Sequence, residues 1–416
     1  MNTPSIGAPD IRIPQLDVMR GVAVLGIYLI NVFVFALPST ALALPQLWGD
    51  DVFWNTVTWS FSEIFVEGTM RGLFSILFGA SALVFLSEAK MAEQGLAVVE
   101  RYYRRTLLLL FFGVIHGFLL LNTLDVLYAY GLLGMFLFPL RRIGGFKLLA
   151  GGVALLALAS VHVASLGEGS EPDAEPVHEA MSGEAMANFE IAATEHMRDE
   201  IAIYHTDYPT IFFFQFSDVV NQESALMYSS HLFDIGGMML VGMALLKLGV
   251  LNGSRPALAY LTLAVLGYCM GGALRGHGIQ QIWAENFDPN MIQIMTTRPL
   301  YGMDRLAITL GHVGLIGLIC KASWTGFLTR PLAALGRMAL TNYIGQTVIS
   351  IFLFYGFGFA LFGTMERLEL YGVAFAVWAT QAAFSMAWLK RHRLGPLEWV
   401  WRSLIYGAPQ PMKRVQ

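Results

Sequence analysis

The stretch MRGVAVLGIYLINVFVFAL at residues 19–37 decides the fold, because it is long and apolar enough to cross a lipid bilayer. A hydrocarbon core about 30 Å thick needs roughly 20 mostly apolar residues in one helix. Similar stretches recur along the whole chain. The predicted spans are 19–37, 64–87, 105–122, 124–140, 146–166, 231–249, 256–274, 305–322, 337–362 and 369–389. The sequence therefore predicts an all-α polytopic membrane bundle of about ten transmembrane helices.

The composition agrees with a multi-pass membrane protein. Of the 416 residues, 56% are hydrophobic and 13% are charged, whereas soluble globular proteins carry about 25% charged residues. We therefore expect membrane lipids as partners. The net charge of −4 argues against a nucleic-acid partner. Cys269 and Cys320 both lie in apolar runs and form neither a disulfide framework nor a metal cluster.

Basic residues alternate with the predicted spans, so that they all fall on one side of the membrane. The positive-inside rule makes this side the cytoplasm and places both termini there. The basic residues are Arg12, Arg20, Lys90, Arg101, Arg104, Arg105, Arg141, Arg142, Lys147, Lys247, Arg255, Lys321, Arg330, Arg337, Lys390, Arg391 and Arg393.

The spans divide into two membrane halves, residues 1–166 and 230–416, on either side of an acidic extracytoplasmic segment at 167–229. Residues 167–184 have a flexible composition, and the pattern from 185 to about 200 predicts an amphipathic helix. Such a charge run is usually a solvated connector, and the alternative is a cap over an extracytoplasmic cleft. YPTIFFFQF at 208–216 is too short to span, so we expect it at the interface or dipping into the bundle.

Ionisable residues inside membrane helices cost a few kcal/mol or more, so each one is a functional hypothesis. Glu67 and Arg71 are four residues apart, which suits an ion pair on one helix. A purely structural pair is the alternative reading. Amides at this depth either glue helices together or bind a polar ligand. The candidate substrate-binding residues are Asn31, Glu67, Arg71, His231, His312, Asn342 and Gln346.

His116 and Asp125 are the candidate catalytic pair. His116 lies in GVIHG within the span 105–122, and Asp125 follows a tight turn at the start of the next span. The two side chains can meet across this hairpin, and a His oriented by a carboxylate is the usual arrangement of a general base. The alternative is a core histidine that bonds a backbone carbonyl. The histidine spacings match no metal-binding pattern.

A second group of charged residues gathers on the cytoplasmic side. Asp17 and Arg20 are three residues apart and share a helix face. Arginines bind phosphates well because the guanidinium fork matches the phosphate oxygens. The candidate residues for binding a phosphorylated cofactor are Asp17, Arg20, Arg104, Arg105 and Arg337. The alternative is that these arginines act only as the topology signal.

Several motifs resemble the YeiB family (domain of unknown function 418) of bacterial inner-membrane proteins. They include RIPQLDVMRGVAVLGIYLINV at 12–32, RGLFSILFGAS at 71–81, LGRMALTNYIGQTVI at 335–349 and GPLEWVWRSLIYG at 395–407. The stretch RRTLLLLFFGVIHGFLLLNTLDVLYAYGLLG at 104–134 carries the resemblance through the predicted catalytic hairpin. The resemblance implies a multi-pass protein of the bacterial cytoplasmic membrane.

The opening LDVMRGVAVL is also similar to the start of two membrane acyltransferase families. These are the heparan-α-glucosaminide N-acetyltransferases and the type 3 acyltransferases, which use a cytosolic acyl donor. Arg20 aligns with an Arg of the type 3 enzymes, but Asn31 stands where those enzymes carry a His. The segment around Trp54 has no His where the glucosaminide enzymes carry theirs. The resemblance thus implies a binding site for the cytosolic acyl donor, but it supplies no catalytic base. Another residue has to be the base, and we select His116.

These observations predict a membrane acyltransferase that moves an acyl group from cytosolic acyl-CoA to an extracytoplasmic acceptor. Acetyl-CoA is the expected co-substrate, with no permanently bound cofactor, and the acceptor is a small molecule or a glycan. A small-molecule transporter or exporter is the first alternative, and a scaffold or lipid-binding protein is the second. The sequence leaves open both the acceptor and a homodimeric assembly.

Overall fold

The computed structural model describes residues 13–50, 52–87, 91–92, 94–168, 183–224, 232–288 and 301–413. Within these ranges the chain forms helices and no strand, which confirms the all-α prediction. The longer helices are α1 (Pro14–Ala36), α3 (Val52–Phe65), α4 (Thr69–Phe85), α6 (Leu96–Val114), α7 (Leu127–Leu140), α8 (Gly145–Glu168), α9 (Gly183–Tyr204), α10 (Tyr208–Asn221), α11 (Leu232–Lys247), α12 (Ala257–Ala284), α14 (Tyr301–Lys321), α15 (Gly326–Arg337), α16 (Ala339–Phe354), α17 (Arg367–Arg391) and α18 (Pro396–Tyr406).

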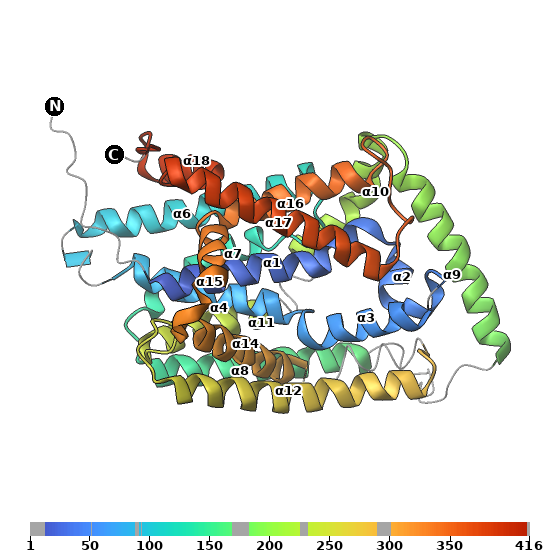
Figure 1. The fold of residues 1–416 in the computed structure, drawn as a ribbon, viewed down its shortest axis with the longest axis horizontal. Helices are drawn as coiled ribbons and strands as arrows, with labels where there is room; N and C mark the ends of the chain where they lie inside the picture. The colour runs from blue at the N-terminus through green and yellow to red at the C-terminus, as the bar shows by residue number, and fades with distance from the viewer. Residues whose placement is uncertain are drawn as a thin grey trace.

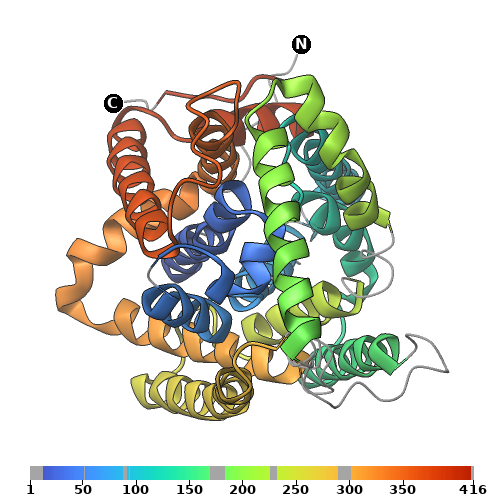
Figure 2. The same ribbon diagram turned by 90° about the vertical axis from the view of Figure 1, so that its right-hand side faces the viewer.

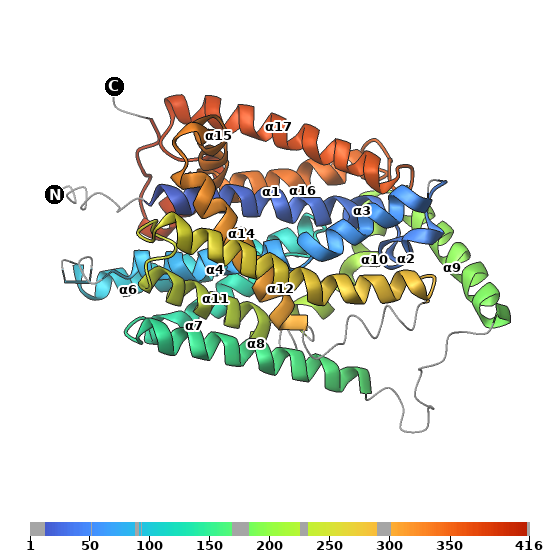
Figure 3. The same cartoon turned by 60° about the horizontal axis from the view of Figure 1, so that its bottom comes forward.

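Helix α1 lies near the centre of the bundle, and α8, α12 and α17 lie at its periphery (Figures 1 and 3). Of the most apolar stretch of α1, 78% is buried, against 22% for α12 and 28% for α17. Since these outer helices are apolar on their exposed faces, their surfaces suit lipid better than water. The core is therefore built around α1.

Within the described ranges, six helical segments are long and apolar enough to cross a membrane, which favours a membrane protein. They are Pro14–Ala36, Val52–Phe85, Gly145–His162, Ala257–Ala284, Tyr301–Lys321 and Arg367–Arg391. Two shorter apolar helices, Leu127–Leu140 and Ala339–Phe354, accompany them. The other two predicted spans, 105–122 and 231–249, fall on α6 and α11. Helix α6 carries several charged residues, and α11 has only 16 residues. By length and composition, neither helix therefore counts as a membrane-spanning segment.

Two glycine positions shape the inside of the bundle. Gly68 has a φ of +65° and separates α3 from α4, because a left-handed residue cannot continue a right-handed helix. Gly336 lies where α15 crosses α1, and a Cβ atom there would stand 1.9 Å from the Asp17 carbonyl oxygen. This close approach lets the steep helix α15 pass against α1 (Figure 1).

The predicted amphipathic helix after the acidic stretch is present as α9, which lies obliquely across one end of the bundle (Figure 2). Glu200 fastens it there, because its carboxylate accepts hydrogen bonds of 2.8 and 2.9 Å from the backbone N–H and hydroxyl of Ser39. The apolar segment predicted at 208–216 lies in α10, where Ile211 and Val219 are buried. The remainder of the acidic segment, at 169–182, lies outside the described residues.

Candidate functional site

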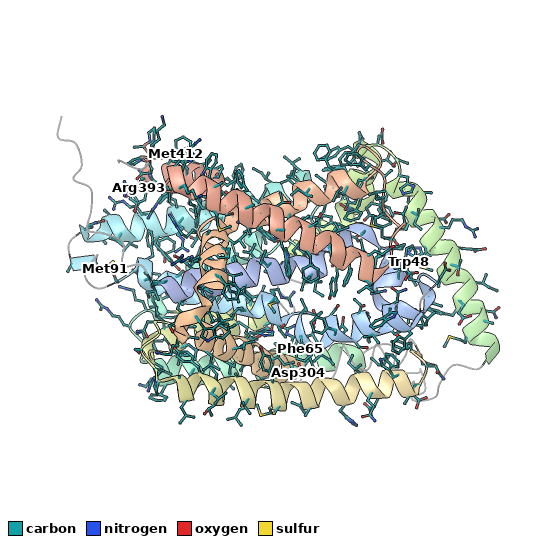
Figure 4. All side chains as sticks on the ribbon, viewed as in Figure 1. Trp48, Phe65, Met91, Asp304, Arg393 and Met412 are labelled. Carbon is teal, nitrogen blue, oxygen red and sulfur yellow. The ribbon has the colours of Figure 1, made fainter. Side chains whose placement is uncertain are left out.

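A cavity of about 480 Å³ opens at the end of the bundle where α1 begins and α18 lies. Arg393 and Met412 mark this end in Figure 4, and Trp48 lies at the opposite end. The cavity has a charged mouth and an apolar interior. The charged lining residues are Asp17, Arg20, Arg105, Arg337, Arg393, Glu398 and Arg402. The five arginines outnumber the two carboxylates, so the mouth is suited to an anion.

Three predicted anion-binding arginines line this mouth, and one does not. Arg20 contacts Asp17 at 3.2 Å, as their spacing predicts, and donates a second hydrogen bond to Ser81. Arg337 donates a hydrogen bond to the carbonyl oxygen of Arg393. Arg104 lies outside the cavity lining, where it pairs with Glu100 at 2.6 Å and donates to a backbone carbonyl of α18.

Arg105 packs among aromatic rings in the cavity wall. Its guanidinium carbon lies 5.3 Å from the ring centre of Phe78 and 5.5 Å from those of Phe85 and Trp401. Among the described residues, no carboxylate lies within salt-bridge distance of it. An arginine that packs against aromatic rings and has no carboxylate partner is available to form charge-assisted hydrogen bonds with a bound anion.

Glu398 was not among the predicted site residues, although it lies at the cavity mouth. Its carboxylate accepts backbone hydrogen bonds from Leu340 and Thr341 at the start of α16, of 2.7 and 3.0 Å, and a third from the Thr341 hydroxyl. A carboxylate is stabilised at a helix N-terminus, while burial raises the pKa of Glu398. Glu398 therefore holds α18 against the first turn of α16.

His116 lies deeper, in a π-helical turn at Ile115–Leu119 that follows α6, and it is fully buried. Its Nδ1 lies 2.7 Å from Asp125 Oδ1, so the two side chains meet across the hairpin as the sequence predicts. The second Asp125 oxygen accepts the Tyr128 backbone N–H at 2.8 Å, at the start of α7. Gly113 permits this packing, because a Cβ there would stand 2.2 Å from the Tyr128 nitrogen.

The other side of His116 contacts Thr347, which sequence reasoning missed. His116 Nε2 lies 2.8 Å from Thr347 Oγ1, and the Asn122 amide donates to the same oxygen at 3.0 Å. Thr347 belongs to GQTVI on α16, a segment where only the neighbouring amides were singled out. Because Thr347 is 231 residues from His116 in sequence, no local spacing could have revealed this contact.

Tyr343 connects the cavity with His116. It lines the cavity, and its ring centre lies 4.9 Å from that of His116. It precedes Thr347 by one helical turn, so both side chains share a face of α16. The Tyr343 ring therefore lies between His116 and the part of the cavity that this tyrosine lines.

Glu67 and Arg71 take part in a buried charge cluster rather than in one isolated pair. Glu67 lies in the turn between α3 and α4, whereas Arg71 lies in α4. Glu67 contacts Arg275 at 3.4 Å and accepts a hydrogen bond from Tyr301 at 3.1 Å. Arg71 contacts Asp234 at 3.4 Å. The charge cluster consists of Glu67, Arg71, Asp234, Arg275, Asp304 and Arg305, and none of these side chains lines the cavity.

The remaining predicted substrate-binding residues that the structure describes do not line the cavity. His312 is a satisfied core histidine, with a ring nitrogen 2.9 Å from the Phe65 carbonyl and the other 2.8 Å from the Tyr268 hydroxyl. Asn342 and Gln346 contact Ser385 and Gln381 of α17 at 3.1 and 3.0 Å. Asn31 is buried in α1, and His231 lies outside the described residues. Within the described ranges, no three His, Cys, Asp or Glu side chains gather as metal ligands.

Residues 245–408 match the family described as "Protein of unknown function (DUF418)". The chain is 28% identical to "Uncharacterized protein YeiB" of Escherichia coli (strain K12), over 95% of this chain and 97% of that protein. The resemblance to the YeiB family is confirmed. The chain is also 27% identical to "Uncharacterized protein YxaH" of Bacillus subtilis (strain 168), over 97% of this chain and 96% of that protein. The similarity to these YeiB-like relatives thus extends over nearly the whole chain.

Proposed function

We propose that this protein is an acyltransferase of the bacterial inner membrane, which takes an acyl group from cytosolic acyl-CoA and transfers it to an acceptor on the other side. The observation that carries the proposal is the cavity itself. It has an arginine-rich mouth and an apolar interior, and one of its lining residues, Tyr343, contacts the histidine of a His–Asp pair.

The cavity matches the chemistry of a long anionic thioester. Small-molecule pockets commonly have volumes of about 300–1,000 Å³, and this cavity of about 480 Å³ lies within that range. The phosphates of the donor would bind Arg20, Arg105 and Arg337 at the mouth, where charge-assisted hydrogen bonds are worth about 1.5–3 kcal/mol each. The pantetheine arm would follow the apolar wall of Phe78 and Leu109 toward Tyr343.

His116 would act as the general base at the end of this path. In the neutral imidazole that acts as a base, Nδ1 donates to the Asp125 carboxylate and Nε2 is a hydrogen-bond acceptor. A base in that tautomer removes the proton from an attacking hydroxyl or amine and later returns it to the leaving group. The buried position of His116 keeps water away from the reacting carbonyl group.

The test is binding and transfer with purified protein and acetyl-CoA. We expect acetyl-CoA to raise the thermal unfolding temperature, because a ligand that binds only the folded state stabilises it. Arg105→Gln should weaken this binding by about tenfold, the equivalent of 1.4 kcal/mol. Arg330→Gln, an exposed arginine of α15 outside the cavity, is the matched control and should bind as the wild type does. If both variants weakened acetyl-CoA binding equally, the cavity mouth would not be the binding site of the donor phosphates.

His116→Ala should keep acetyl-CoA binding but lose transfer to an acceptor by about 10²–10⁴-fold, the usual contribution of a general base. Transfer is followed with radiolabelled acetyl-CoA in membranes that contain native acceptors. Wild-type transfer by a folded His116→Ala variant would rule out this residue as the base.

The charge cluster favours a second candidate function, the export of a small molecule. Buried charges in membrane bundles often belong to transport pathways, and this cluster contributes nothing to the cavity. In proteoliposomes with an imposed pH gradient, a transporter would accumulate a member of a panel of radiolabelled amino acids and sugars. An acyltransferase would accumulate none and would instead consume acetyl-CoA.

A further inference from the structure

The hydrogen bonds around Thr347 have a defined direction. When the imidazole is neutral and the Asp125 carboxylate accepts from His116 Nδ1, Nε2 carries no proton and accepts the Thr347 O–H. The Asn122 amide donates to the same Thr347 oxygen. A hydroxyl has one proton and two lone pairs, so one lone pair of Thr347 remains for attack on an electrophile.

Thr347, like Ser350 on the same helix, makes hydrogen bonds across the bundle instead of the local bond that several buried serines make. Ser75, Ser81 and Ser160 each donate to the backbone carbonyl four residues earlier, at 2.7–3.0 Å. Such bonds satisfy a buried hydroxyl within its own helix. Thr347 instead makes hydrogen bonds across the bundle to His116 and Asn122. Its hydroxyl is therefore held by the candidate base rather than by its own helix.

Two donors contact His116 Nε2 within the described residues, the Thr347 hydroxyl at 2.8 Å and the Asn122 amide at 3.4 Å. Of these two, the hydroxyl is the group whose proton an imidazole base can remove. The His116 and Thr347 side chains are at most 1% exposed, so an external acceptor would have to displace Thr347 to reach the base. Thr347 lies one helical turn, about 6 Å, beyond Tyr343, which lines the cavity. The donor carbonyl would meet Thr347 before it meets any acceptor.

Resting on the acyltransferase function above, we propose that Thr347 is the nucleophile of a covalent acyl-enzyme, with His116 as its base and Asp125 as the group that orients His116. The Thr347 oxygen attacks the thioester carbon and its proton passes to His116 Nε2. The carbon–sulfur bond then breaks, and the thiolate takes this proton and leaves as free CoA thiol. An acceptor hydroxyl or amine attacks the Thr347 ester, gives its proton to His116, and Thr347 recovers a proton as its ester bond breaks.

Thr347→Val is the decisive variant, because it keeps the shape of the side chain and removes the hydroxyl. Purified wild-type protein is mixed with acetyl-CoA without acceptor, and free CoA is titrated with a thiol reagent. The peptide that contains Thr347 is then analysed by mass spectrometry. We expect a burst of about one CoA per active site and an acetyl group on Thr347, as covalent catalysis requires.

Thr347→Ser should keep the burst, whereas Thr347→Val should abolish the burst and the adduct and lower transfer by about 10³-fold. Thr380→Val is the control, since Thr380 is exposed on α17 and bonds its own helix at 2.9 Å. Retained acetyl-CoA stabilisation shows that Thr347→Val is folded.

Two results would overturn the proposal in distinguishable ways. If Thr347→Val transfers acyl groups at the wild-type rate, or wild-type protein transfers without an adduct, transfer is direct and only the acyl-Thr347 step is lost. If wild-type protein neither binds nor consumes acetyl-CoA, the acyltransferase function and the acyl-Thr347 step both fall.

Discussion

At the scale of single residues, Glu223 gives the protein a titration near neutral pH. It follows α10 and approaches the turn that carries His116, where a Cβ on Gly117 would stand 2.9 Å from its Oε1. That oxygen has no hydrogen-bond partner among the described residues. Burial, together with the charge of Asp125, raises the pKa of Glu223 to about 7 from its ordinary 4.5. The folded state therefore favours the protonated carboxyl.

This pKa predicts how stability changes with pH. Between about pH 4.5 and 7 the folded protein holds a proton that the unfolded chain has released, so ionisation of Glu223 opposes folding as the pH rises through this window. We expect Glu223→Gln to gain thermal stability relative to wild type at pH 8 and little at pH 5. Unfolding temperatures in detergent measure this difference. Glu195→Gln, exposed on α9, is the control and should show no such pH dependence.

At the scale of elements, the crossing of α1 and α15 builds the cavity mouth. The close approach of α15 to α1 at Gly336 brings Arg20 on α1 and Arg337 on α15 to the same cavity mouth. Gly336→Ala would put a methyl group 1.9 Å from the Asp17 carbonyl oxygen, so the helices must separate. Overpacking of this kind costs about 1–3 kcal/mol.

We therefore expect Gly336→Ala to lower the unfolding temperature and to weaken stabilisation by acetyl-CoA. Gly272→Ala on α12 is the matched control, because a Cβ there meets nothing within 4 Å and alanine favours a helix. An unfolding temperature equal for both variants would show that α1 and α15 tolerate wider separation than the structure indicates.

The local patterns predicted these elements unevenly. Hydrophobic runs placed α1, α12 and α17 well, because a membrane helix is defined by the composition of its own residues. The break at Gly68 and the π-helical turn at His116 were not predicted. The glycine did not reveal the break, because glycines also occur inside unbroken membrane helices. The π-helical turn was not predictable because no particular amino-acid composition marks such a turn. The spacing of Glu67 and Arg71 therefore suggested a pair that the broken helix does not form.

At the scale of the whole molecule, the bundle has two chemically different ends. The arginine-rich cavity opens at the end with Arg393 and Met412, while Trp48 lies at the other (Figure 4). From the positive-inside rule we expect the first end to face the cytoplasm. In a background with Cys269 and Cys320 replaced, we expect Lys413→Cys to react with an impermeant maleimide only after the cells are opened. Thr206→Cys, exposed beyond α9, should react in intact cells.

Reversed labelling of these two positions would place the cavity on the outer face and exclude cytosolic acyl-CoA as its ligand. Labelling of both positions in intact cells, with an intact-membrane control, would contradict the proposed orientation without affecting the all-helical fold.

By itself, the sequence determined the helical membrane bundle, the local pair Asp17–Arg20 and the hairpin contact of His116 with Asp125. Each of these depends on residues within a few turns of one another, where helix geometry converts spacing into distance. Only the tertiary structure decided that Thr347 completes the His116 hydrogen bonds, that Arg393 and Arg402 join the cavity mouth, and that Glu67 faces Arg275. Those contacts depend on how each helix is rotated about its axis and packed against the others. A helix that is hydrophobic on nearly all sides has no polar stripe in its sequence to show which face points inward, so the sequence leaves that rotation undetermined.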